Sequence, residues 1–202
     1  MDKLSADRPR SFSQLPRTPL AAFTAIVAAG ILAAPATAAP RAAVAAAGRT
    51  ALECHVATTP DHPVTFSPAL TLRPRTIRMT ATFRLTGCSS PAGTERRLRT
   101  GVLTVQGRGN ASCTGGTQLS GSAAVTWYDS AGHKSGTSTI KSTRSSVSGY
   151  NPTDALFGGE VVSGSLAGTK VSGSATPTSD VTPCASSGLR TLHGAGTLSF
   201  KR

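Results

Sequence analysis

The alternation of apolar and polar residues in Thr76–Thr86 constrains the fold of this chain more than any other feature of its sequence. Arg78 and Arg84 stand among the polar positions, and every second residue is apolar: Ile77, Met79, Ala81, Phe83 and Leu85. Successive side chains of a strand point to opposite faces. The pattern therefore predicts a strand with one buried face and one solvent-exposed face.

Shorter segments of the same kind follow this strand, and no segment after residue 50 shows a sustained helical period. The expected strands lie around Leu52–Val56, Leu70–Leu72, Val102–Gln106, Ser122–Tyr128, Lys134–Lys141, Val161–Leu166, Lys170–Ala175 and Leu198–Phe200. Prolines predict a loop or sheet edge over Thr58–Pro68, and glycines predict a connection around Cys113. The expected fold is a single all-β domain over 51–202, an antiparallel sandwich or barrel.

Residues 1–38 have the three parts of a secretory signal peptide. Basic residues come first, Leu20–Ala34 is an uncharged apolar run of 15 residues, and Ala36-Thr37-Ala38 is a small-residue cleavage motif. The run is shorter than the roughly 20 residues that span hydrocarbon. We expect a secreted chain with no membrane span after cleavage, and a flexible Ala-rich lead-in over 39–50.

All four cysteines follow the leader: Cys54, Cys88, Cys113 and Cys184. An even number of cysteines in an exported chain implies disulfides, here two. Three pairings are possible, and the sequence alone does not choose among them. We favour Cys54–Cys88, which would tie an early strand to the end of the Thr76–Thr86 strand, together with Cys113–Cys184. A zinc site is disfavoured because no C-x-x-C or H-x-x-x-H spacing occurs.

Loose motifs spread over most of the chain after the leader resemble those of a known group of proteins. They are Gly87-Cys88-Ser89, the segment from Gly107 to Cys113, Val125-Thr126-Trp127, the segment from Val162 to Gly168, Pro183-Cys184, and the segment from Gly196 to Phe200. The chain resembles small secreted β-rich, four-cysteine proteins of actinobacteria, to which no common activity is assigned. The resemblance implies export and an all-β fold, and it carries over no catalytic residue.

Positive charge is the main indication of a ligand. Lys and Arg number 21 against 9 Asp and Glu, which gives a formal net charge of +12. Seven arginines fall between residues 73 and 99, with Glu95 as the only acid among them. Guanidinium groups pair with phosphate and carboxylate. The expected ligand-binding residues are Arg78, Arg84, Arg96, Arg97 and Arg99; the alternative is that they form a solvated, solubilising face.

Tyr128 is a further candidate, because adjacent strand residues point oppositely and either Trp127 or Tyr128 should be exposed. An exposed aromatic ring could stack on a sugar; the alternative is that both rings serve packing. His55, Asp61 and His62 form the only close group of histidines and acids, and no third metal ligand accompanies the two histidines.

The sequence contains no G-x-S-x-G, H-E-x-x-H or Walker motif. We therefore expect no catalytic residue, no cofactor and no metal. The expected function is a non-catalytic binding or cell-envelope-associated module for an anionic wall polymer or a glycan. Nucleic acid is disfavoured because no aromatic residues are interleaved with the arginines. The alternative is a secreted hydrolase, or an enzyme inhibitor that presents the stretch Ser142–Gly159.

Overall fold

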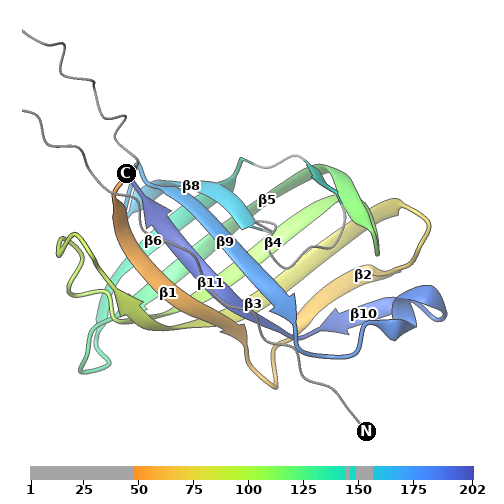
Figure 1. The fold of residues 1–202 in the computed structure, drawn as a ribbon, viewed down its shortest axis with the longest axis horizontal. Helices are drawn as coiled ribbons and strands as arrows, with labels where there is room; N and C mark the ends of the chain where they lie inside the picture. Colours follow the sequence, from red (N-terminus) through yellow and green to blue (C-terminus); the bar gives the residue numbers. More distant parts are fainter. Residues whose placement is uncertain (1–47, 144–145, 149–156) are drawn as a thin grey trace, which may run out of the picture. The chain divides into compact units, whose positions relative to one another are not determined.

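The computed structural model describes residues 48–143, 146–148 and 157–202, and these residues form β-strands joined by short connections (Figure 1). The strands are β1 (Thr50–Thr58), β2 (Val64–Leu70), β3 (Arg75–Ser89), β4 (Thr100–Ser112), β5 (Gly115–Tyr128), β6 (Lys134–Ser142), β7 (Ser146–Ser148), β8 (Phe157–Gly164), β9 (Lys170–Pro177), β10 (Leu189–Leu192) and β11 (Gly194–Lys201). One 3₁₀ helix, η1, covers Thr182–Ala185. Among the described residues, no helix is long and apolar enough to cross a membrane.

Eight of these strands close an antiparallel barrel. They follow the order β1-β11-β9-β8-β6-β5-β4-β3, and β3 pairs back with β1, as in Val56 opposite Leu85. The predicted all-β fold is thus confirmed, as a barrel. β1 and β2 pair with the same edge of β3, β2 with its first half and β1 with its second half. The other edge of β2 pairs with β10, just as the other edge of β1 pairs with β11. We call the two ends of the barrel the Thr50 end, where β1 begins and β3 ends, and the Leu70 end, where β2 ends and β3 begins.

β3 is the strand predicted from the alternating pattern. Ile77, Ala81 and Leu85 are buried inside the barrel, and Arg78 and Arg84 are exposed outside it. The strand is longer than predicted, because its first half pairs with β2 and its second half pairs with β1. A single long strand therefore joins the two ends of the barrel.

The two disulfides join the pairs of cysteines that the sequence favoured. Cys54–Cys88 links neighbouring strands β1 and β3 in the buried interior. Cys113–Cys184 links the turn between β4 and β5 to η1, across 71 residues of sequence. A barrel with few aromatic side chains gains most from such links, because they restrict the unfolded chain.

Two predicted connections are strands instead. The segment Thr58–Pro68, predicted as a loop or edge, contains most of β2; Pro68 is tolerated there because the β2–β3 register covers only Thr65–Ser67. The glycine-rich segment before Cys113 continues β4 to Ser112, paired with β3 on one side and β5 on the other. The predicted signal peptide lies outside the described residues, as do residues 39–47 of the lead-in. β1 already begins at Thr50.

Candidate functional site

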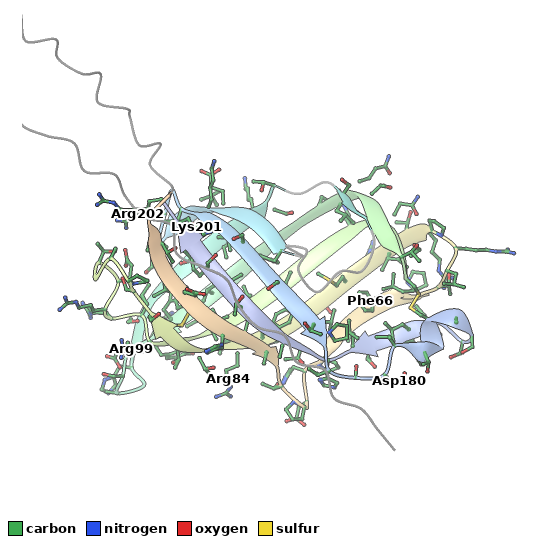
Figure 2. The ribbon with its side chains drawn as sticks, in the orientation of Figure 1. Phe66, Arg84, Arg99, Asp180, Lys201 and Arg202 are labelled. Atoms are coloured by element: carbon green, nitrogen blue, oxygen red, sulfur yellow. A yellow bond between two sulfur atoms is a disulfide. The ribbon has the colours of Figure 1, made fainter. Side chains whose placement is uncertain are left out.

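The five predicted arginines do not share one surface. Arg78 and Arg84 lie on the outer face of β3, whereas Arg96, Arg97 and Arg99 lie in the β3–β4 connection at the Thr50 end. The N–H of Cys88 donates to the carbonyl of Arg99 at 3.2 Å. Ten residues of strand separate Arg78 from Cys88, which corresponds to about 33 Å. Arg78 is therefore remote from the loop arginines. Figure 2 labels one arginine of each group, Arg84 on β3 and Arg99 in the loop.

Acidic groups compensate part of the charge at the Thr50 end. Arg202 Nη2 donates to Glu95 Oε1 at 2.8 Å. The pKa of Asp129 lies below its ordinary value, mainly because the backbone N–H of His133 donates to its carboxylate; the N–H of Ala131 and the charges of His133 and Arg97 lower it further. The loop arginines thus belong to a mixed field of charges and not to a purely basic patch.

Tyr128, the other predicted contact residue, lies at this same end. Its side chain is half-buried, and its carbonyl accepts the N–H of Arg99 at 2.9 Å. Trp127 is fully buried and packs edge-on against Phe200, with ring centroids 5.6 Å apart. Of the two adjacent aromatic residues, Trp127 serves the core, and Tyr128 presents only part of its ring.

At the Leu70 end, strand pairing places Arg78 beside a second basic residue, which the sequence analysis did not predict as a ligand contact. Arg108 on β4 lies directly opposite Arg78 on β3. Ser67 on β2 is opposite Arg78, and Ser120 on β5 is opposite Arg108. All four side chains are exposed on the outer face. We call these four residues the arginine row.

Arg108 was missed because its glycine neighbours indicated a connection instead of a strand. The signal was nevertheless present: polar residues at 104, 106, 108 and 110 continue the alternation of Val102–Gln106 through the glycines. Neither Arg78 nor Arg108 takes part in an ion pair within the described part of the chain. Like charges directly opposite each other destabilise a sheet, and no acidic side chain among the described residues forms an ion pair with either arginine.

A shallow groove of about 350 Å³ lies on the same outer face, next to the arginine row. Its lining includes four threonines, Thr65, Thr80, Thr82 and Thr104, with Gln106, Asp61 and His62. We call it the threonine groove. Thr80 is two residues from Arg78 on the same face of β3, and the hydroxyl groups of Thr65 and Thr80 lie 2.6 Å apart. Together the groove and the row offer hydroxyl, amide and guanidinium groups on one sheet face.

The histidines lie in four separate places. His62 lines the threonine groove, while His55 lies on β1 opposite Thr86. His133 is in the β5–β6 turn near Asp129, and His193 stands next to Thr58 between β10 and β11. Across residues 48–143, 146–148 and 157–202, no group of three or more His, Cys, Asp or Glu side chains could hold a metal ion.

Comparison with known proteins adds no family assignment, since no family model, curated protein or solved structure matches the chain. The function is therefore argued from the chain's own geometry.

Proposed function

We propose that the protein is an exported, non-catalytic binding module for an anionic polymer that carries sugar hydroxyls, such as a phosphate-bearing wall polymer or an acidic glycan. The observation that carries this proposal is the pairing of Arg78 with Arg108 on exposed neighbouring strands. An anion between two guanidinium groups removes their repulsion and accepts hydrogen bonds from both. Such a site is therefore more stable when a phosphate or carboxylate occupies it.

The threonine groove supplies the second half of the proposed site. Its hydroxyl groups and the amide of Gln106 can exchange hydrogen bonds with sugar hydroxyls, while the arginine row holds the charged group of the same polymer. The groove lining contains no Phe, Tyr or Trp. Binding should therefore depend on charge and hydrogen bonding instead of ring stacking, and it should weaken as salt screens the charges.

Export is proposed on the signal-peptide pattern of residues 1–38 and on the two disulfides, which persist in oxidising compartments. Much of the stretch Ser142–Gly159, predicted as the presenting loop of an inhibitor, lies outside the described residues. No observation favours that alternative, or a hydrolase, over the binding module.

The test is co-sedimentation of the purified protein with isolated bacterial cell walls from about 0.01 M to 1 M salt, over which the Debye length falls from about 30 Å to about 3 Å. We expect binding at low salt that disappears at high salt. The variant Arg78→Gln/Arg108→Gln should lose most of it. Arg96→Gln/Arg97→Gln removes the same charge from the Thr50 end and should retain most of it. Equal losses in both variants, or no binding at low salt, would contradict the proposal.

A further inference from the structure

The interior of the barrel differs between its two ends. At the Thr50 end it is filled by large side chains, among them Trp127, Phe200, Leu52, Leu85 and Leu103, each at most 2% exposed. Trp127 and Phe200 span the width of the barrel there, because their rings pack against each other. An eight-stranded barrel is just wide enough to be filled in this way or to hold one small ligand.

At the Leu70 end the inward positions of β4 and β5 carry glycine and alanine instead. Gly107, Gly109 and Ala111 face inward on β4, and Gly121 and Ala123 face inward on β5. These small residues leave a cavity of about 200 Å³ inside the barrel. Large apolar side chains also line it, namely Phe66, Leu70, Ile77, Met79, Leu119 and Phe157, together with Val105 and the polar residues Gln106, Arg108, Ser120, Ser122 and Ser142. In Figure 2, Phe66 lies toward the opposite end from Arg99 and Lys201.

A β-bulge builds part of this lining. The register of β4 with β5 shifts between Arg108 and Asn110, and Gln118 has a positive φ of 52°. The one extra residue on β5 brings Leu119 over Gly109, where an added Cβ would lie only 2.6 Å from Leu119 Cδ2. Glycine at 109 is thus what lets Leu119 enter the barrel. The bulge thus turns Leu119 toward the interior, and the missing side chain at Gly109 leaves room for it.

Within residues 48–143, 146–148 and 157–202, several side chains that line the cavity are partly exposed to solvent. Phe66, Met79, Leu119 and Phe157 point into the barrel and are only half-buried, whereas Ile77, which lies nearer the start of β3, is buried. Water that reaches these rings and side chains gains few hydrogen bonds from them. An apolar molecule that displaces it is favoured by the area removed from water.

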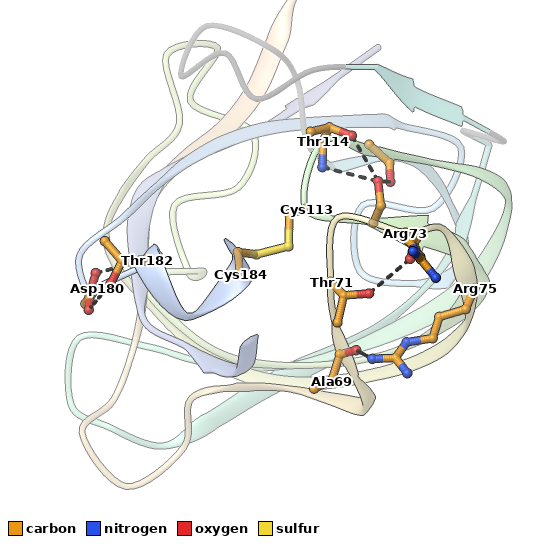
Figure 3. Close-up of a disulfide and its surroundings, with 11 residues drawn as sticks. Ala69, Thr71, Arg73, Arg75, Cys113, Thr114, Asp180, Thr182 and Cys184 are labelled. Atoms are coloured by element: carbon orange, nitrogen blue, oxygen red, sulfur yellow. Dashed lines mark hydrogen bonds between the residues drawn. A yellow bond between two sulfur atoms is a disulfide. The ribbon is translucent and has the colours of Figure 1, made fainter. Parts of the chain in front are cut away.

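The rim of the cavity is held by covalent and hydrogen bonds. Cys113, two residues after the cavity residue Ala111, is bonded to Cys184 (Figure 3), and its N–H donates to the carbonyl of Thr71 at 2.9 Å. Arg75 Nη2 donates to the carbonyl of Ala69 near the same rim. These links fix Leu70 and Ala111 in place, so the entrance is largely preformed. A preformed site costs less entropy to fill.

We propose that this cavity binds a small apolar ring molecule of about six to ten carbon atoms. An apolar cavity of about 150 Å³ stays dry and takes up benzene, so one of about 200 Å³ has room for a slightly larger ring compound. Drug-sized ligands need about 300 Å³ or more and are too large. The proposal uses the inward-facing side chains of these strands, whereas the polymer site uses the outward-facing ones, although Gln106, Arg108 and Ser120 contribute to both sites.

The test is an NMR titration of the purified, oxidised protein with toluene, using pyrene as a probe that is too large. We expect saturable shifts with toluene at the amides of Met79, Val105, Gly107 and Ala123, and none with pyrene. Ala123→Leu extends a side chain into the cavity and should weaken toluene binding at least about tenfold. Ala124→Leu, on the outer face of the same strand, should leave it unchanged.

Gly107→Ala serves if Ala123→Leu does not fold. Its added Cβ would meet Met79 Cε at 3.4 Å and the carbonyl of Ser120 at 3.5 Å, which are ordinary contacts. This variant should bind toluene at least about threefold more weakly. The proposal is overturned if toluene causes no saturable shift in the unmodified protein, if the shifts lie outside the cavity lining, or if Ala124→Leu weakens binding as much as the cavity variants do.

Discussion

Trp127 Nε1 donates a hydrogen bond of 2.8 Å to Ser138 Oγ in the interior of the barrel. Trp127 is 0% exposed and Ser138 is 1% exposed, so water can replace neither partner. Ser138 in turn donates to the carbonyl of Ser165, in the connection between β8 and β9. The Ser138 hydroxyl thus accepts the hydrogen bond of the Trp127 indole N–H and also holds the β8–β9 connection through Ser165.

Ser138→Ala should therefore destabilise the protein by about 1–3 kcal/mol, the cost of leaving a buried donor without a partner. Urea unfolding followed by Trp127 fluorescence measures this. Ser135→Ala is the matched control, since Ser135 Oγ is buried and has no hydrogen-bond partner among the described residues, so its removal should cost close to nothing. Equal effects of the two substitutions would show that the Trp127–Ser138 bond contributes little.

Removing one arginine of the row should stabilise the free protein. Arg78→Gln relieves the repulsion from Arg108, and we expect a gain of about 0.2–1 kcal/mol at low salt, decreasing as salt is added. Thermal unfolding at several salt concentrations measures it. Arg84→Gln is the control, because Arg84 lies opposite Val102 and Ala57 and has no cationic cross-strand neighbour. A loss of stability in Arg78→Gln would mean that the pair is not repulsive.

Each disulfide should contribute about 4 kcal/mol by the chain-entropy model, because the cysteines are separated by 34 and 71 residues. Cys54→Ala/Cys88→Ala and Cys113→Ala/Cys184→Ala should each lower the free energy of unfolding by about that amount, as measured in urea. The second variant should also increase hydrogen exchange around η1. A loss below about 1 kcal/mol in either would contradict the entropic account.

Asp129 should add a stabilising contribution that is lost in acid. Its pKa is lowered in the folded state, chiefly by the N–H of His133, so the contribution is complete above the ordinary value of 3.8 and disappears as pH falls through the folded value. The stability difference between the unmodified protein and Asp129→Asn should therefore shrink between about pH 5 and pH 3. Ser130→Ala, in the same turn, should show no such trend. A difference that grows in acid would refute the assignment.

Two glycines in the cavity wall should respond differently to alanine. At Gly121 a Cβ would lie 2.7 Å from the carbonyl of Gln106, so β4 and β5 must separate, and we expect a loss of about 1–3 kcal/mol. At Gly107 the nearest atom is 3.4 Å away, and Gly107→Ala should change stability by less than about 1 kcal/mol. Urea unfolding of the two variants side by side tests the contrast; similar losses would contradict it.

The sequence by itself determined the fold class, and it favoured, without determining, the disulfide pairing that the structure shows. The alternation in Thr76–Thr86 predicted which face of β3 is buried, because side-chain direction in a strand depends only on the local period of two. The favoured pairing of Cys54 with Cys88 followed from placing one cysteine in an early strand and the other at the end of β3. The first argument needs only information from neighbouring residues, whereas the second also assumes that the two strands lie side by side, which the structure confirms.

The tertiary structure determined which residues from distant segments of the sequence lie next to each other. Local pattern cannot show that Arg78 faces Arg108 on β4 while the loop arginines lie at the other end, because register depends on pairing between distant segments. It also cannot show whether glycine and alanine at 107, 109, 121 and 123 leave an empty volume, since that depends on the side chains reaching across the barrel from β2, β3 and β8. Strand register therefore created the arginine row, and closure of the barrel created the cavity, from residues that the sequence presents separately.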